Sequence, residues 1–366
     1  MSTRGADCPD ILRVDPARET ERIVTSIRDT VLTQLKRKGA VVAVSGGIDS
    51  SVVAFLCARA LGRDRVLALF MPETDSSPES LRLGRKVTES LDVRSVVEDI
   101  TPILRGARCY ERRDEAVRKV IPEYGEGYRC KIVLPDLVDA DRYALFSVVV
   151  QSPNGETKKV RLSAAAYLGI VAATNFKQRT RKMIEYYYAD LLQYAVAGTP
   201  NRLEYDQGFF VKNGDGAADL KPIAHLYKSQ VYQLAAYLGV PEEIQLRPPT
   251  TDTYSLEQTE EEFYFSIPLG KMDLCLYGKN HGISAEDLAP VKNGGCLDAT
   301  CGFGQPRHLT GAFPRPGGKQ LIDVFKLEAG HLGENPHHGG DAVFLVIILE
   351  HIDDFPMLFV EFTDAF

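Results

Sequence analysis

The sequence predicts an α/β protein built on a doubly wound parallel sheet, with helices on both faces of the sheet. Three short, largely apolar runs at 40–44, 65–70 and 93–97 are typical of parallel strands that are buried on both faces. Apolar residues recur at helical spacing in the intervals between these runs. Strands and helices that alternate in this way predict a ligand site at the carboxyl ends of the strands.

Further elements follow from periodicity and turn residues. Helices are expected over 16–38, 52–61, 79–91, 174–194 and 231–238, the last of which stops at Gly239. A strand is expected at 193–197. The segments 144–151 and 156–162 flank Ser-Pro-Asn-Gly, which predicts an antiparallel hairpin inside an insertion of about 107–173. The stretch from 291 is rich in Gly, Pro and His, then apolar at 342–349, where a buried strand is expected. We therefore expect a main domain over 1–290 and a C-terminal segment of unknown role over 291–366.

The most informative motif lies between the first predicted strand and the helix that follows it. Residues 45–51 read Ser-Gly-Gly-Ile-Asp-Ser-Ser. A glycine turn into a helix directs backbone N–H groups and the positive end of the helix dipole at one point, which favours phosphate. Asp49 fits an anion site only beside a cation, and Mg²⁺ bridging a carboxylate and phosphates meets that need. No Gly-Lys-Ser/Thr follows, so this is not a mononucleotide P-loop. The alternative is a turn whose serines cap the helix.

Composition narrows the class of protein. Hydrophobic residues at 44% and charged residues at 25% are ordinary for a soluble protein, and the formal net charge of −7 argues against a general nucleic-acid surface. No apolar run approaches the ~20 residues that span a bilayer, and the start lacks the apolar core of a secretory signal. Seven irregularly spaced cysteines indicate reduced thiols and a cytoplasmic location. Cys296 and Cys301 lack the second pair of a typical zinc site.

A second polar cluster occupies 198–228. It begins with Gly198-Thr199 after an apolar segment, continues through Glu204 and the Gly-rich stretch 208–219, and ends at Lys228. The sequence motifs of a known family occur here in the same order: the 45–51 loop, Gln-Arg-Thr-Arg at 178–181, this polar cluster and Pro249-Thr250. Across 20–282 the chain resembles the ammonia-dependent NAD synthetases, which belong to the ATP pyrophosphatases.

The resemblance implies an adenine nucleotide alpha hydrolase-like fold and a homodimer. It implies that ATP adenylates the nicotinate carboxylate of deamido-NAD and that ammonia then displaces AMP, without a covalent nucleophile. The implied ATP contacts are Ser45, Gly46, Gly47, Ile48, Asp49, Ser50, Ser51, Thr199, Lys228 and Thr250. The implied Mg²⁺ ligands are Asp49 and Glu204, and the implied substrate contacts are Arg179, Lys212 and Asp219. Thr199 and Asp219 keep an alternative role as helix caps.

Three features depart from the family pattern. The 107–173 insertion precedes Arg179 and could reshape the acceptor pocket. No His-Lys pair follows residue 290, although the family closes its site with one. The family's acidic stretch after Pro-Thr is present only loosely, as Glu257 and Glu260-Glu261-Glu262. No glutaminase domain is evident, so we expect free ammonia, or ammonia from a separate glutaminase, as the nitrogen source.

Three alternatives stay open at this stage. The same adenylation and amidation could act on a different small carboxylate in a specialised pathway. A tRNA-modifying pyrophosphatase is disfavoured by the acidic charge and the lack of a clear basic RNA-binding surface. A non-catalytic, synthetase-like binding protein is disfavoured by the intact set of Asp49, Glu204 and Lys228.

Overall fold

The computed structural model describes residues 9–134, 146–251, 253–260, 268–284 and 288, and the backbone of two strands near the C-terminus. The chain divides into two compact units, 1–302 and 303–366. The described part of the second unit is an antiparallel pair, β8 (Leu345–Ile352) and β9 (Phe355–Phe362). The strand expected at 342–349 is therefore found from Leu345 onward. Its predicted burial, and the cysteines at 296 and 301, lie outside what the structure describes.

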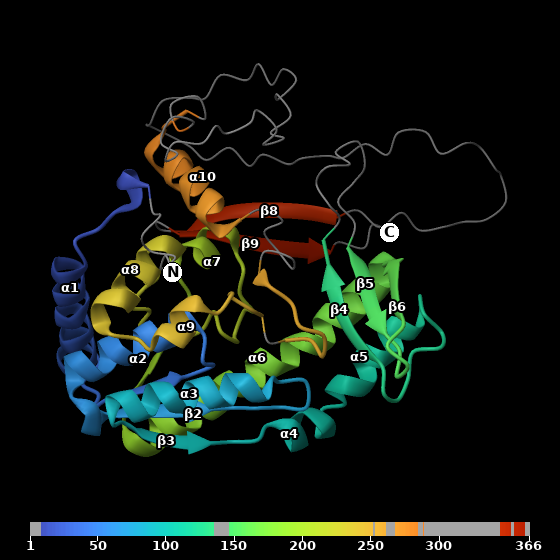
Figure 1. Cartoon of the computed structure of the whole chain (residues 1–366), viewed down its shortest axis with the longest axis horizontal. Helices are drawn as coiled ribbons and strands as arrows, with labels where there is room; N and C mark the ends of the chain where they lie inside the picture. The colour runs from blue at the N-terminus through green and yellow to red at the C-terminus, as the bar shows by residue number, and fades with distance from the viewer. Residues whose placement is uncertain are drawn as a thin grey trace. The chain divides into compact units, whose positions relative to one another are not determined.

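The centre of the first unit is a four-stranded parallel sheet (Figure 1). Its strands are β3 (Arg94–Val97), β2 (Val66–Phe70), β1 (Ala40–Ala43) and β7 (Ala195–Ala197), in that spatial order. All three strand pairs are parallel. Because paired residues of β1 and β7, such as Ala40 and Ala195, are 155 positions apart along the chain, the carboxyl ends of these strands bring distant segments to one edge of the sheet.

Both faces of the sheet are covered by helices, as predicted for a doubly wound fold. Alternate residues of the strands face opposite sides, so that Val42 and Val41 belong to different hydrophobic clusters. One cluster includes side chains from α1 (Pro16–Arg28), α2 (Ile48–Leu61), α3 (Pro78–Leu91) and α8 (Lys228–Leu238). The other includes side chains from α4 (Thr101–Gly106), α5 (Cys109–Arg118) and α6 (Ala164–Leu192).

The insertion forms a small antiparallel sheet of its own. It contains β4 (Arg129–Val133), β5 (Ser147–Gln151) and β6 (Thr157–Arg161), with β5 in the middle. The predicted hairpin is confirmed, because Gln151 pairs with Thr157 across the turn. Strand β4 was not predicted. In Figure 1 this sheet lies at the opposite end of the first unit from α1 and α8. It packs on α5 and the first turns of α6 around buried side chains that include Ile132, Val148 and Ile170.

Several helix boundaries differ from the sequence expectation. The helix predicted over 16–38 is α1 followed by a π-helical turn, η2 (Asp29–Gln34), and Asp15 caps its start by accepting from the backbone N–H groups of Ala17 and Arg18. Helix α6 begins at Ala164, ten residues before the predicted start, and the hydroxyl of Ser163 accepts from Ala166 N. Short elements complete the described unit: η1 (Asp10–Leu12), η3 (Arg63–Arg65), α7 (Arg202–Gln207), α9 (Glu242–Leu246) and α10 (Leu269–His281). None of the helices in the described ranges combines the length and hydropathy needed to cross a bilayer.

Candidate functional site

The 45–51 loop connects the carboxyl end of β1 to the start of α2. Gly46 has a φ of +75°, and a Cβ at this position would lie 2.6 Å from the carbonyl oxygen of Ser80. A glycine is therefore required both by the backbone conformation and by the contact with α3. Gly47 is the N-cap of α2, and no side chain caps the helix. The N–H groups of the first helical turn consequently face the site without a side-chain acceptor.

The serines of the loop mainly bind the loop itself. Ser51 is fully buried, and its hydroxyl donates to the carbonyl oxygen of Gly47 at 2.7 Å. Ser50 donates to the same oxygen at 3.1 Å and accepts from the backbone N–H of Ser45 at 3.2 Å. The hydroxyl of Ser45 lies 3.1 Å from that of Ser50. Both donors of Ser51 are thus used inside the loop, since its N–H also bonds Gly47 O.

A second segment reaches this edge of the sheet from the end of β7. Thr199 is half-buried between β7 and α7, and Asn201 is the N-cap of α7 through its side-chain oxygen and the N–H of Glu204. The alternative in which Thr199 caps that helix is therefore wrong. The side-chain amide of Asn201 donates to Asp49 at 3.1 Å and to Glu204 at 2.8 Å. Asn201 thereby holds the two predicted metal ligands beside each other.

Lys228 and a third carboxylate complete the cluster. Lys228 is almost fully buried at the first position of α8, and its Nζ donates to Asp49 at 2.6 Å. The same Nζ lies 3.2 and 3.4 Å from the two carboxylate oxygens of Glu260. Oxygen atoms of Asp49, Glu204 and Glu260 all lie within 4.8 Å of one another, the spacing of ligands around one metal ion.

The charges in this cluster shift one another's pKa values. Burial raises the pKa of Glu204 well above its usual range, and the charge of Asp49 raises it further. Burial of Lys228 opposes its charge, but the neighbouring carboxylates, Asp49 first, outweigh burial and hold its pKa well above the ordinary value. The cluster is therefore short of positive charge, because three carboxylates share one ammonium group. A divalent cation would supply that charge.

Two further groups fix the ends of the elements that carry the cluster. Asp273 in α10 accepts from the backbone N–H groups of Lys228 and Ser229, and so orients the first turn of α8. Burial raises the pKa of Asp273 to about 6. Thr250 lies at the base of a loop that carries Glu260, where Thr250 and Thr259 form an antiparallel bridge. Glu260 N donates to Pro249 O at 3.1 Å.

The three predicted substrate contacts have hydrogen bonds of their own. Arg179 in α6 and Lys212 are both exposed and adjacent, because Arg179 Nε donates to the carbonyl oxygen of Lys212 at 3.2 Å. Asp219 accepts from Tyr186 Oη at 3.2 Å and from the backbone N–H of Val196 at 2.8 Å. Asp219 thus binds the open edge of β7. The helix-cap alternative for Asp219 is wrong, because the next helix begins at Lys228 with Tyr227 as its N-cap.

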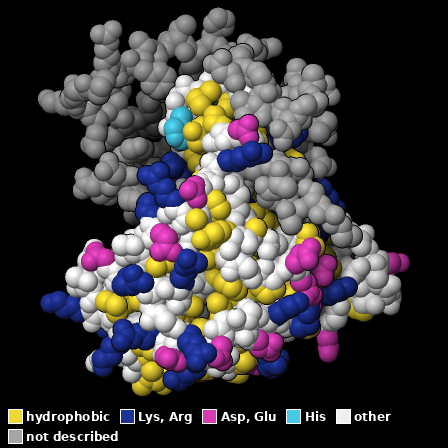
Figure 2. Space-filling model, turned by 60° about the vertical axis from the view of Figure 1, so that its left-hand side comes forward, with side chains coloured by type: hydrophobic (Ala, Val, Ile, Leu, Met, Phe, Trp, Pro, Cys, Tyr) yellow, Lys and Arg dark blue, Asp and Glu magenta, His cyan; other side chains and the backbone are white. Residues whose placement is uncertain are grey.

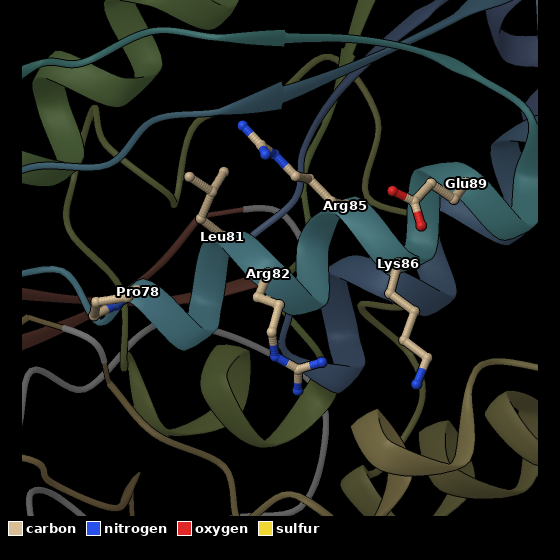
Figure 3. A pocket seen from close by; sticks show the side chains of 6 residues that line it. All are labelled: Pro78, Leu81, Arg82, Arg85, Lys86 and Glu89. Carbon is tan, nitrogen blue, oxygen red and sulfur yellow. The ribbon is translucent and has the colours of Figure 1, made fainter.

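A hollow on the surface of α3 is separate from this cluster. Its lining side chains all belong to α3 (Figure 3): Pro78, Leu81, Arg82, Arg85, Lys86 and Glu89. The residues of α3 that contact Gly46 are instead buried. Arg82 and Lys86 already pair with Glu243 of α9. On the face drawn in Figure 2, the described basic and acidic side chains are interspersed, so this face presents no single-sign patch.

Sequence reasoning missed three residues of the site. Asn201 carries a recognisable signal, because Asn is a preferred N-cap and it directly precedes α7. Glu260 belongs to the acidic stretch noted after Pro-Thr, but nothing local distinguishes it from its neighbours. Asp273 lies within a helix, where only the fold brings it to the start of α8.

Known proteins resemble this chain along most of its length. The sequence model of the NAD synthase family matches residues 19–120 and 154–292. An NH3-dependent NAD+ synthetase from Rhizobium meliloti is 60% identical over 284 residues, which cover 78% of this chain and 85% of the relative. One from Thermotoga maritima is 37% identical over 275 residues, which cover 74% of this chain and 91% of the relative. A solved structure of NMN synthetase from Francisella tularensis shares the fold, with a TM-score of 0.54 and 23% identity over 76% of this chain and 92% of that protein.

Proposed function

Because the chain belongs to the NAD synthase family, we propose that it amidates deamido-NAD with ammonia at the expense of ATP, by way of an adenylated carboxylate. The observation that carries the mechanism is the meeting of the 45–51 loop with Asp49, Glu204, Glu260 and Lys228 at one edge of the parallel sheet. Ligand sites of doubly wound proteins lie at this edge.

The first step joins the nicotinate carboxylate to the α-phosphate of ATP. A carboxylate oxygen attacks the α-phosphorus, the bond between this phosphorus and the bridging oxygen breaks, and pyrophosphate leaves. The N–H groups at the start of α2 bind the leaving phosphates, and Lys228 stabilises the charge that develops on them. Thr199 and Thr250 border the same edge and contact ATP in this proposal. Ser51 contributes by holding the loop in shape.

Mg²⁺ fits the carboxylate cluster. Asp49, Glu204 and Glu260 offer hard oxygen ligands at suitable spacing, and the cluster is short of positive charge. Mg²⁺ held there supplies Lewis-acid neutralisation of the phosphate charge. Asn201 fixes the orientation of Asp49 and Glu204 toward one another.

The second step replaces AMP with nitrogen. Ammonia attacks the acyl carbon of the adenylate, the bond to the AMP oxygen breaks, and one proton is lost to give the amide. Arg179 and Lys212, adjacent and exposed, supply cationic contacts for the anionic dinucleotide in this proposal. We also propose Asp219 as an acceptor contact, in line with the family resemblance; its carboxylate accepts from Tyr186 Oη and Val196 N in this structure.

We further propose that the enzyme is a cytoplasmic homodimer with its ligase domain in 1–290. Met183, Tyr187 and Leu191 are spaced by four residues on α6 and are 55%, 59% and 62% exposed. An apolar stripe of this kind marks an interaction surface, and a two-fold dimer is the commonest assembly. Light scattering of the active enzyme at micromolar concentration should return about twice 40.5 kDa, and a mass of 40.5 kDa would contradict the dimer.

The defining experiment mixes the protein with ATP, Mg²⁺, ammonium and deamido-NAD and separates the nucleotides by chromatography. We expect NAD, AMP and pyrophosphate in equal amounts, and no turnover when glutamine replaces ammonium. Stoichiometric ADP would refute the adenylation step. Pyrophosphate release with some other carboxylate, but none with deamido-NAD, would keep the ligase chemistry and refute the acceptor.

A further inference from the structure

The inserted sheet supports a loop of the proposed active site. The free edge of β4 receives residues 254–258: Leu256 N donates to Cys130 O at 3.2 Å. The hydroxyl of Ser255 accepts from Cys130 N at 2.9 Å and lies 3.4 Å from Cys130 O, to which it can donate. The side-chain amide of buried Gln258 donates to Ile132 O. An edge strand that would otherwise expose its N–H and C=O groups is thus paired with this loop.

The tip of the same loop is held by a buried ion cluster. Lys177 of α6 donates to Thr253 O at 2.6 Å, to Glu73 at 2.9 Å and to Asp75 at 2.7 Å. The side chains of Lys177 and Glu73 are 1% and 0% exposed. Tyr254 then enters the hydrophobic cluster of the inserted sheet, among residues that include Cys130 and Ile132. Both sides of the tip are therefore fixed to the body of the protein.

The stem of the loop leads into the carboxylate cluster. Thr251 N donates to Gln258 O at 3.2 Å, Thr250 and Thr259 bridge, and Glu260 N donates to Pro249 O. Glu260 follows directly and contacts Lys228. The orientation of Glu260 thus depends on a loop in which Ser255, Leu256 and Gln258 bond β4. The family model leaves 121–153 unmatched, and that span holds β4 and β5.

We propose that the inserted sheet is a template that orders residues 253–260, and that Ser255 and Gln258 are positioning residues for Glu260. A loop held only at its base would have to be ordered each time the site binds Mg²⁺-ATP, and that conformational entropy would weaken binding. Because Ser255 and Gln258 bond β4, the conformational entropy of the loop is lost when the protein folds, and not when Mg²⁺-ATP binds. The role assigned to Glu260 rests on the proposed function.

The test compares Ser255→Ala, Gln258→Ala and the double variant with the wild-type enzyme. We expect the concentration of Mg²⁺ that half-saturates pyrophosphate release to rise about two- to tenfold for each single variant, and further in the double variant. The Michaelis constant for ammonium should stay unchanged, and Ser255→Thr should restore most of the loss because it keeps the hydroxyl. Lys158→Ala is the matched control, since Lys158 of β6, a strand of the same inserted sheet, pairs with Glu123 outside the loop.

Hydrogen exchange gives a readout that needs no turnover. Amides of 253–260 should exchange faster in the Ser255 and Gln258 variants than in the wild type, whereas those of 48–61 should not change. Equal exchange in variant and wild type, or faster exchange with unaltered Mg²⁺ dependence, would overturn the positioning role. A wild-type protein that fails to amidate deamido-NAD would refute the proposed function instead, and the exchange result would still decide whether β4 orders the loop.

Discussion

Replacing Asp49 with asparagine separates catalysis from stability. The substitution keeps the shape of the side chain and an oxygen that can accept from Lys228, but it removes one of the three negative charges of the cluster. Loss of one preorganised electrostatic group at the reacting phosphates costs about 10²–10³ in kcat, or ~2.7–4 kcal/mol. We therefore expect Asp49→Asn to lower kcat for pyrophosphate release by at least a hundredfold at saturating Mg²⁺.

The same substitution should cost much less stability. The hydrogen bond from the Lys228 ammonium then ends on a neutral amide oxygen in place of a carboxylate, which loses about 1 kcal/mol. Removing the charge of Asp49 also relieves Glu204, whose pKa that charge helps to raise. The free energy of unfolding, measured by urea denaturation, should thus fall by about 1 kcal/mol or less. Asp206→Asn is the control, because Asp206 lies two residues from Glu204 on α7 but pairs with Arg202 and Asn280. Near-normal kcat in Asp49→Asn, or an equal loss in Asp206→Asn, would refute the reasoning.

Three further predictions follow from single contacts. Lys212→Ala should raise the Michaelis constant for deamido-NAD roughly ten- to hundredfold and leave that for ATP little changed, as expected for one charge-assisted contact; equal effects on both constants would contradict this role. Lys177→Met should lower the free energy of unfolding in urea by ~3–5 kcal/mol, because it leaves Glu73 buried without its cation, whereas Asp75 keeps its ion pair with Arg113; a change near zero would show that the pair of Lys177 and Glu73 is not needed. The pKa of Asp273 rises on folding from 3.8 to about 6, so the folded state binds a proton more tightly than the unfolded state does. Asp273 therefore stabilises the folded state by up to ~3 kcal/mol below pH 4, and this contribution is lost as the pH rises through 6. In Asp273→Asn, the free energy of unfolding should no longer fall between pH 4 and pH 6. An unchanged dependence on pH would show that another group titrates.

Much of the fold could be predicted because its signals are local. The strands at 40–44 and 65–70 are continuous apolar runs, since both faces of a parallel sheet are buried, and the structure confirms them as β1 and β2. The Ser-Pro-Asn-Gly turn also specified its hairpin locally. Strand β4 escaped prediction because Arg129 and Lys131 interrupt its apolar residues, and its pairing with β5 is set by contacts across the sheet. The start of α6 at Ala164 was missed because its first turns pack on α5 and the inserted sheet.

For the candidate site, the sequence by itself determined the anion loop and the family, because the 45–51 motif needs only its own backbone to present N–H groups and a carboxylate. It also supplied Asp49, Glu204 and Lys228 as separate candidates. Only the tertiary structure brought these residues together with Asn201 and Glu260, since parallel pairing of β1 with β7 joins residues 155 positions apart. Only the structure showed that the inserted sheet contacts the loop that contains Ser255 and Gln258. These hydrogen bonds use backbone groups of the edge strand β4, and every residue but proline carries the same groups, so the sequence gives no sign of which loop will bind there.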